Sequence, residues 1–176
     1  MKLTLHAHQL ELAHTFGISR ERYDRQPTLI ACLESGGKKG YGEATSNPYY
    51  GVTVEGLIKE IEKARSAVEA FPQTDPEAFY ELLENLELTP FARCALDLAC
   101  NDLHGKLLGK PLYAIWGTAA RDLPVTNFTI GLDTPEKMVA KMQERPWPVY
   151  KIKLGTDRDV ALVRELRQHT DAVFRV

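Results

Sequence analysis

Three short runs of β-branched and apolar residues recur at a constant spacing in the second half of the chain. They begin at Val125, Val149 and Val173, 24 residues apart, and helical patterns open near Thr134 and Thr156 between them. Parallel strands need helical crossovers, so the alternation predicts a doubly wound sheet or a (β/α)8 barrel. A barrel takes roughly 250 residues in all. We therefore expect the N-terminal part of a longer protein, cut in the third barrel strand.

The first part of the chain follows a different pattern. Residues 2–14 alternate in polarity like a half-buried strand, and residues 27–35 resemble a second strand. Gly36 and Gly37 then provide a turn towards a third segment at residues 41–44. These segments predict a small antiparallel sheet.

Capped helices are predicted after this sheet. A capping residue precedes each of them, and the predicted helices are Val54–Ala70 after Thr53, Pro76–Leu86 after Asp75, and Pro90–Leu108 after Thr89. Strands followed by helices are typical of an α+β domain. We place this domain at residues 1–120 and the β/α units of the barrel at 121–176, with the boundary within the polar connection 117–124.

The second strand of the repeat carries the clearest chemical signal. Side chains alternate along a strand, so Lys151 and Lys153 lie on one face, about 6.5 to 7 Å apart, while Ile152 and Leu154 lie on the other. Two ammonium groups inside a parallel sheet are costly unless a wet or anionic site receives them. Close like charges and partial burial lower the pKa of a lysine and make it a usable base near neutral pH. The alternative is an exposed edge strand with solvated lysines.

The composition argues against several functional classes. The chain has 44% hydrophobic and 26% charged residues, with a net charge of -2 and both signs interspersed, which argues against a nucleic-acid-binding surface. No apolar run approaches the ~20 residues of a membrane span. The first 15 residues do not resemble a signal peptide. We therefore expect a cytoplasmic protein.

The cysteines indicate neither a disulfide framework nor a zinc site. Cys32, Cys94 and Cys100 are odd in number and lack a C-x-x-C spacing, so we expect them to be small apolar core residues. On the third predicted helix, a packing stripe is expected to contain Cys94, Ala95, Leu98, Ala99 and Leu103.

Four segments of the chain carry a family resemblance. They are Tyr41–Ala44 (YGEA), the helical stretch Ala95–Leu112, Phe128–Gly131 (FTIG) and Tyr150–Gly155 (YKIKLG), and together they span essentially the whole chain. In this order they resemble the N-terminal half of the enolase superfamily, in the muconate lactonizing enzyme subgroup and, within it, the dipeptide epimerases. The resemblance implies an α+β capping domain over a modified (β/α)8 barrel, which agrees with the two-part organisation.

The resemblance also implies a mechanism. Members of this family abstract a proton α to a carboxylate and hold the resulting enediolate on Mg²⁺. By the motif, Lys153 is the base on one face of the α-carbon, and Lys151 favours its neutral form and helps to bind the substrate carboxylate. Thr129 matches a substrate-contacting threonine of the epimerases, at a position on the first barrel strand. The second acid/base and the metal carboxylates are expected beyond Val176, with no metal ligand within this chain.

Substrate specificity is expected in two irregular loops, residues 16–25 (FGISRERYDR) and 46–53 (SNPYYGVT). In the family the corresponding loops close over the active site and contact the substrate side chain. The pocket candidates are Arg20, Arg22, Tyr23, Tyr49 and Tyr50. Cationic groups would favour an acidic second residue such as glutamate, and aromatic groups would favour apolar dipeptides; the sequence does not separate the two. The alternative is that these are solvated loop residues.

Other polar residues have structural interpretations. His6 and His8 form an H-x-H pair that could open a zinc site in a barrel hydrolase. Here a hairpin follows instead of a crossover helix, which favours a surface or core pair. Glu43 is expected to make a structural hydrogen bond, and Asp97 and Asp102 are expected to cap or pair locally on their helix.

These inferences predict a Mg²⁺-dependent dipeptide epimerase in the complete protein, acting on L-Ala-D/L-Glu or related L-Ala-X dipeptides. The 176-residue chain alone is expected to be inactive. An o-succinylbenzoate synthase or cycloisomerase of the same subgroup is one alternative, and a non-catalytic binding fragment is another if the chain ends at Val176. The expected partner is a small dipeptide, without nucleic acid or membrane, and homo-oligomerisation is left open.

Overall fold

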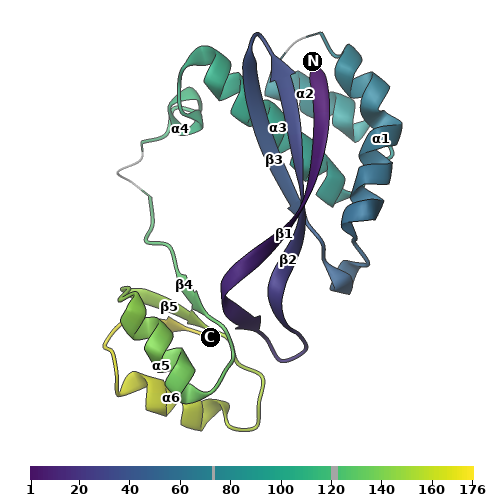
Figure 1. Cartoon of the computed structure of the whole chain (residues 1–176). Helices are drawn as coiled ribbons and strands as arrows, with labels where there is room; N and C mark the ends of the chain where they lie inside the picture. The colour runs from purple at the N-terminus through teal and green to yellow at the C-terminus, as the bar shows by residue number, and fades with distance from the viewer. Residues whose placement is uncertain (73, 120–122) are drawn as a thin grey trace. The chain divides into compact units, whose positions relative to one another are not determined.

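The computed structural model describes residues 1–72, 74–119 and 123–176. They form two compact units, and each draws on two stretches of chain (Figure 1). The first unit contains Met1–Leu10 and Gln26–Arg121, and the second contains Glu11–Arg25 and Asp122–Val176. The boundary expected at 117–124 includes residues 120–122, which lie outside the described residues. Residues 11–25, the tip of the hairpin formed by the first two strands, thus group with the parallel strands of the second unit. The division expected from the sequence placed these residues in the first domain.

A three-stranded antiparallel sheet contains β1 (Lys2–Gly17), β2 (Arg22–Ser35) and β3 (Lys38–Thr45), in the order β1-β2-β3. In the turn before β3, Gly36 and Gly37 have φ angles of 56° and 71°, which a residue with a side chain rarely adopts. The predicted antiparallel sheet is thus confirmed. Its first two strands are longer than predicted.

The helices of the first unit follow their capping signals closely. They are α1 (Val54–Ala70), α2 (Pro76–Glu84) and α3 (Pro90–Leu108), with the short helices η1 (Pro48–Tyr50) and α4 (Leu112–Ile115). The predicted residues cap the N-termini of the three longer helices, because side chains of Thr53, Asp75 and Thr89 accept N–H groups of the first turn. Only α2 ends earlier than predicted, at Glu84.

Helix α3 packs against β3 without intervening side chains. A Cβ atom added to Gly42 would lie 2.0 Å from the carbonyl oxygen of Ala95 and 2.6 Å from the nitrogen of Ala99. A Cβ added to Gly40 would lie 2.2 Å from the carbonyl oxygen of Ala99. Strand and helix therefore meet backbone to backbone at these positions. The close fit leaves no room for any side chain at Gly40 or Gly42.

The predicted apolar stripe of α3 is only partly correct. Cys94 is exposed and Leu98 is 46% exposed. Because α3 also contacts α1 and α2, its buried side extends to a second stripe with Leu96 and Cys100. Burial, with the nearby charges of Asp97 and Asp75, raises the pKa of the Cys100 thiol to about 12. The core assignment thus holds for Cys32 and Cys100 and is wrong for Cys94.

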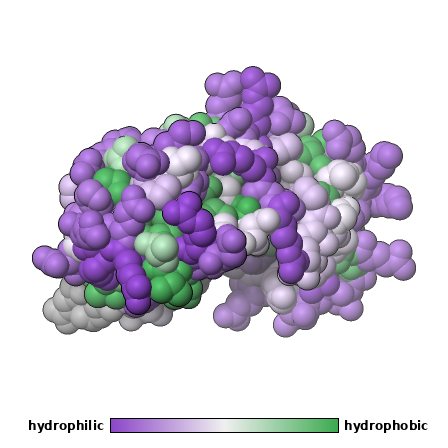
Figure 2. Space-filling view, turned by 90° about the horizontal axis from the view of Figure 1, so that it is seen from below, coloured by the Kyte–Doolittle hydropathy of each residue, from purple (hydrophilic) through white to green (hydrophobic). Residues whose placement is uncertain are grey.

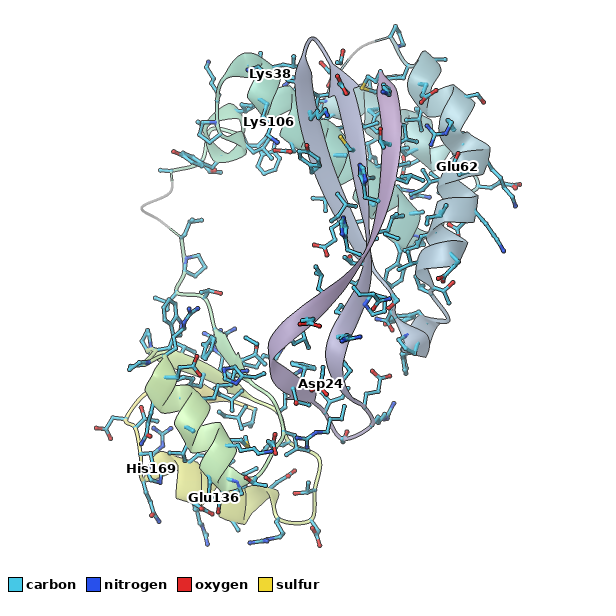
Figure 3. All side chains as sticks on the ribbon, in the orientation of Figure 1. Asp24, Lys38, Glu62, Lys106, Glu136 and His169 are labelled. Carbon is cyan, nitrogen blue, oxygen red and sulfur yellow. The ribbon has the colours of Figure 1, made fainter. Side chains whose placement is uncertain are left out.

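The N-terminus of β1 is held to α1 by a charged cluster. The Arg65 guanidinium donates to the carbonyl of Leu3 at 2.6 Å and to Glu69 at 2.9 Å. The Glu69 carboxylate in turn accepts the N–H of Leu3 at 3.0 Å. Arg65 also pairs with Glu62 at 2.7 Å, on the outer side of α1 (Figure 3). The cluster fixes the first residues of the chain to the helix.

Replacing Arg65 by methionine should destabilise the protein by about 1 kcal/mol, because Leu3 and Glu69 lose a charged donor. Two hydrogen bonds hold the pKa of Glu69 below its ordinary value of 4.5: the one from the N–H of Leu3 has the larger effect, and the one from Arg65 the smaller. The part of the contribution that comes from Glu69 is therefore complete above that value and is lost as the pH falls through the lowered pKa, whereas the hydrogen bond to the Leu3 carbonyl remains. Urea denaturation should show a difference between wild type and variant near pH 7 that shrinks near pH 3. The exposed Lys63→Met is the control, and a pH-independent difference would contradict this account.

The second unit contains a parallel sheet with helical crossovers. Its elements are β4 (Phe128–Ile130), α5 (Pro135–Glu144), β5 (Val149–Ile152), α6 (Asp159–Arg167) and β6 (Val173–Arg175), with the strand order β4-β5-β6. The predicted β/α alternation is confirmed, and with it the predicted fold class of an α+β unit followed by the start of a parallel barrel sheet.

Two details of the repeat differ from the prediction. The first strand begins at Phe128, which pairs with Tyr150, and Val125 lies outside it with 56% exposure. Helix α6 begins at Asp159 rather than directly after Thr156. The reason is local, because the Asp159 carboxylate accepts the N–H groups of Gly155 at 3.0 Å and Thr156 at 2.9 Å and so holds a turn before the helix.

One face of the parallel sheet is buried under α5 and α6. Tyr150 is 2% exposed, and its ring lies 6.3 Å from that of Phe128 and 6.4 Å from that of Phe174. Its hydroxyl accepts the N–H of Trp147 at 2.9 Å and donates to the carbonyl of Met142 at 3.1 Å. The three rings therefore mark the core side of the sheet. The next residue along each strand points to the opposite side.

The surface is mixed in character. On the face shown in Figure 2, hydrophilic side chains surround small hydrophobic patches. Among the described residues, no helix has both the length and the apolar character that a membrane crossing requires.

Candidate functional site

The two lysines of the YKIKLG segment occupy the side of the sheet opposite the core. Tyr150 and Ile152 are each 2% exposed, whereas Lys151 is exposed and Lys153 is half-buried. The N–H of Lys153 donates to the carbonyl of Ile130 at 3.0 Å, so the strand pairing continues one residue past β5. The expected alternation of the segment is therefore present, and the side chain of Lys153 begins at the carboxyl end of the strand.

A row of polar residues crosses the three strands at the level of Lys151. Thr129 pairs with Lys151 in the β4–β5 register, and Lys151 pairs with Arg175 in the β5–β6 register. None of the described residues in β4, β5 and β6 is acidic. This side of the sheet is therefore cationic, and it suits an anionic ligand.

Arg175 was not among the candidates from the sequence. The signal was present, because the spacing of 24 residues that links Val149 to Val173 also links Lys151 to Arg175. Residues at equivalent positions of neighbouring parallel strands share a face. Applying the repeat to Lys151 would have identified Arg175.

The tip of the β1–β2 hairpin lies on the carboxyl ends of β4 and β5. The carbonyl of Gly17 accepts the N–H of Leu132 at 2.8 Å. A Cβ atom added to Gly17 would lie 2.3 Å from the carbonyl oxygen of Leu132, and one added to Gly155 would lie 2.4 Å from the Cβ of Ser19. In barrel enzymes the carboxyl ends of the strands carry the active site. The tip thus borders the edge of the sheet where catalytic groups are expected.

The structure alters the expected first loop. Residues 16–25 were predicted to be irregular, but β1 continues to Gly17 and β2 begins at Arg22, which leaves a short connection closed by the N–H of Ile18 donating to Glu21 at 2.9 Å. The strands persist because cross-strand side chains pair, as in the hydrogen bond that the Thr15 hydroxyl donates to Asp24. The prediction of a long irregular loop is wrong here.

The three candidates of this hairpin have different surroundings. Arg22 pairs with Asp133 at 2.7 Å. The ring of Tyr23 packs 5.5 Å from that of Phe16, and burial, followed by the charge of Glu21, raises its pKa. Arg20 is exposed at the tip, next to Ser19. Both arginines are exposed, and the side chain of Arg22 is 53% exposed despite its ion pair with Asp133.

Tyr49 and Tyr50 belong to the first unit. They form part of η1, with 70% and 65% exposure, and their rings meet edge to face at 4.9 Å. The ring of Tyr50 also lies 5.7 Å from that of Phe91 on α3. The left-handed Gly51, with a φ angle of 65°, ends this turn. The two rings form a small exposed aromatic group.

The polar residues with structural interpretations behave as expected. Glu43 accepts the hydroxyl of Thr28 at 2.6 Å, and Asp102 accepts the ammonium of Lys106 at 2.6 Å. Asp97 accepts a hydrogen bond from the side-chain amide of Asn101, and His6 and His8 are both exposed, with their rings stacked at 6.4 Å. Within residues 1–72, 74–119 and 123–176, no three His, Cys, Asp or Glu side chains form a group that could hold a metal ion.

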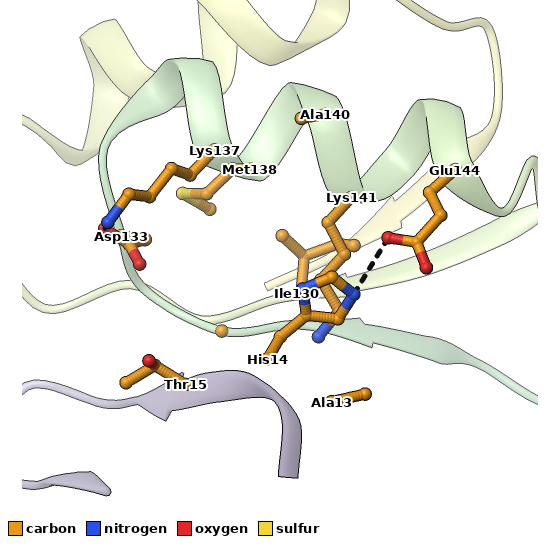
Figure 4. A pocket seen from close by; sticks show the side chains of 11 residues that line it. Ala13, His14, Thr15, Ile130, Asp133, Lys137, Met138, Ala140, Lys141 and Glu144 are labelled. Atoms are coloured by element: carbon orange, nitrogen blue, oxygen red, sulfur yellow. Dashed lines mark ion pairs between the residues drawn. The ribbon is translucent and has the colours of Figure 1, made fainter. Parts of the chain in front are cut away.

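A pocket of about 370 Å³ lies beside α5 in the second unit (Figure 4). His14 of β1 and Glu144 of α5 pair across it at 2.9 Å. Burial lowers the pKa of Lys141, which also lines the pocket, and the charge of Glu144 opposes this shift. Ile130 and Met138, both core residues, form part of its wall. The pocket is thus on the helix side of the sheet and not on the side of Lys151.

The sequence of this chain is similar to those of known proteins over its whole length. No protein-family model matches the chain. The chain is 61% identical over 176 residues to an L-Ala-D/L-amino acid epimerase of a Maribacter species, over 100% of this chain and 52% of that protein.

Solved structures give the same result. An enolase family member from Agrobacterium tumefaciens with homology to dipeptide epimerases, containing sodium and L-Ala-L-Glu with an ordered loop, matches with a TM-score of 0.83 and 31% identity, over 98% of this chain and 52% of that one. A dipeptide epimerase from Enterococcus faecalis, complexed with Mg and L-Leu-L-Tyr, matches with a TM-score of 0.86 and 28% identity, over 99% of this chain and 52% of that one.

By sequence and by fold, the chain corresponds to the N-terminal half of enolase-family dipeptide epimerases. It spans about half the length of the relatives it matches. The first unit matches the capping domain of the enolase-family fold, and the parallel sheet is the start of its barrel. The cationic row therefore lies on the first strands of an enolase-family barrel.

Proposed function

We propose that the complete protein epimerises dipeptides by removing and returning the proton α to a carboxylate. The observation that supports this most directly is the position of Lys151 and Lys153, on the cationic side of the sheet at the carboxyl end of β5. The similarity to dipeptide epimerases over the whole chain supports the same reaction. The activity concerns the complete protein, because the chain covers about half of its relatives.

Lys153 would be the base on one face of the α-carbon. Its neutral amine takes the α-proton and becomes an ammonium, while the electron pair moves into the carboxylate of the substrate. Lys151 would donate hydrogen bonds to that carboxylate. Inversion requires a second acid on the opposite face, because return of the proton from the same side regenerates the starting epimer.

A divalent metal would stabilise the negative charge that develops on the substrate. Mg²⁺ requires oxygen ligands, mostly from carboxylates and water. The residues described in β4, β5 and β6 do not fit this requirement, since they contribute cations to the face and no carboxylate. The metal ligands and the second acid would therefore have to come from other parts of the complete protein.

Selection of the dipeptide side chain would depend on the hairpin tip. Arg20 is the exposed cation of the tip, and its guanidinium could meet the side-chain carboxylate of L-Ala-Glu. Thr129, in register with Lys151, offers a hydroxyl to the substrate. An arginine at the tip favours acidic dipeptides over apolar ones.

Replacing Arg20 by methionine in the complete enzyme should lower kcat/KM for L-Ala-L-Glu by about one to two orders of magnitude, because a charge-assisted hydrogen bond contributes about 1.5 to 3 kcal/mol. The value for L-Ala-L-Leu should change little, since that side chain makes no ionic contact. Proton exchange from each dipeptide in D2O, followed by NMR, measures both reactions. If the ratio of kcat/KM for L-Ala-L-Glu to kcat/KM for L-Ala-L-Leu did not change, Arg20 would be a solvated residue without a role in substrate selection. If wild type exchanged no α-proton from any dipeptide, the proposed activity itself would be wrong.

A further inference from the structure

Close contacts leave the hairpin tip little freedom. Gly17, Gly131 and Gly155 make room for the tip. A Cβ atom added to Gly131 would lie 3.1 Å from the nitrogen of Gly17. Leu132 occupies the space beside Gly17, and Ser19 occupies the space beside Gly155. The backbone of the tip therefore lies directly against the segments that follow β4 and β5.

One ion pair joins the tip to the start of α5. A terminal nitrogen of Arg22 donates to Asp133 Oδ2 at 2.7 Å, while Asp133 Oδ1 accepts the N–H of Thr134 at 2.8 Å. The ammonium of Lys137 lies 3.6 Å from Oδ1. The Asp133 side chain is only 16% exposed. Both of its oxygens are thus engaged, and its position is fixed by its own helix.

The charges around Asp133 favour its ionised form. Burial acts to raise the pKa of this carboxyl group, but the N–H of Thr134 and the charges of Arg22 and Lys137 outweigh it, so the pKa is lowered. Asp133 therefore stays charged at neutral pH and remains an acceptor for Arg22. The Arg22 nitrogen that donates to Asp133 is therefore engaged by the protein itself.

We infer that Asp133 and Arg22 form a latch that positions the hairpin tip over the carboxyl ends of β4 and β5. Asp133 is then a positioning residue that acts through Arg22, and Ser19 and Arg20 are the residues it holds at the edge of the site. The inference rests on the proposed function, and it assigns Arg22 a role different from that of Arg20. A latch affects every dipeptide alike, whereas a substrate ligand affects only the acidic ones.

The test compares Arg22→Met, Asp133→Asn and the double variant in the full-length enzyme. The side-chain oxygen of the amide introduced by Asp133→Asn can still accept the N–H of Thr134, so the helix start is retained. Each single variant should raise KM for both L-Ala-L-Glu and L-Ala-L-Leu by about three- to fivefold, with little change in kcat. The double variant should be no worse than either single one, because both remove the same contact. Arg25→Met is the matched control, since Arg25 pairs with Glu11 on the same hairpin and both side chains are largely exposed.

A second readout does not depend on activity. Amide hydrogen exchange at residues 18–21 should be faster in Arg22→Met and in Asp133→Asn than in wild type or Arg25→Met. A variant in which the two charges are swapped, Arg22→Asp with Asp133→Arg, should restore part of the protection of these amides against hydrogen exchange. A selective loss of L-Ala-L-Glu turnover in Arg22→Met alone, or unchanged exchange at the tip in both single variants, would overturn the latch. If no dipeptide were turned over, hydrogen exchange would still decide the question.

Discussion

Replacing Lys153 by alanine in the complete enzyme is expected to slow α-proton exchange from one epimer of the substrate by about 100- to 10,000-fold, the usual contribution of a positioned base. The expectation follows from the placement of Lys153 at the carboxyl end of β5, on the side of the sheet that faces away from the core. Exchange from the other epimer should persist, because the opposite base removes that proton. Epimerisation, which needs both bases, should be lost.

Solvent deuterium incorporation, followed separately for each epimer by NMR, measures this asymmetry. Metal affinity should be unchanged in Lys153→Ala, since the lysine is not a ligand, and calorimetry with Mg²⁺ checks this point. Lys110→Ala is a suitable control, because Lys110 is an exposed lysine in the first unit. Undiminished exchange from both epimers would exclude Lys153 as a base.

The largest expected effect on stability comes from Gly42→Ala. The new methyl group would lie 2.0 Å from the carbonyl oxygen of Ala95 and 2.6 Å from the nitrogen of Ala99, and both are backbone atoms of α3. Neither can move without displacing the helix from the sheet. We expect a loss of about 3 kcal/mol or more, at the upper end of the range for overpacked cores.

Urea denaturation monitored by circular dichroism measures this loss. Gly56→Ala provides the control, because the atom nearest to its added methyl group is the side-chain oxygen of Thr53, 3.1 Å away. This contact requires a shift of a few tenths of an ångström at the oxygen that caps α1, whereas alanine favours the helix at this position by up to about 1 kcal/mol, so the two effects oppose each other. A Gly42→Ala protein as stable as wild type would mean that α3 does not lie against β3 as described.

Local signals in the sequence were sufficient for most elements. The caps at Thr53 and Thr89 predicted the starts of α1 and α3 correctly, because a side-chain acceptor marks a helix start within a few residues of sequence. The left-handed Gly109 likewise marked the end of α3. The alternation in Tyr150–Gly155 likewise predicted which side chains share a face. Such features depend on neighbours along the chain, which the sequence displays directly.

Contacts between distant segments were harder to predict. The continuation of β1 to Gly17 depends on pairing with β2 and on the segment around Leu132, far along the chain. Arg22 looked like a free loop cation because its partner, Asp133, has no local relation to it. Cys94 was misplaced because the buried side of α3 extends from Ala95 towards Leu96 and Cys100, away from Cys94.

The hairpin whose base belongs to the first unit and whose tip belongs to the second has a consequence for how such enzymes can be recombined. A crossover between two related genes near residue 120 would join a foreign barrel to the original tip. The glycines at positions 131 and 155 and the carboxylate at position 133 would then have to match a tip inherited from the other parent. Capping domains and barrels are therefore expected to be inherited as compatible pairs, and chimeras should fold best when residues 11–25 come from the same parent as the barrel.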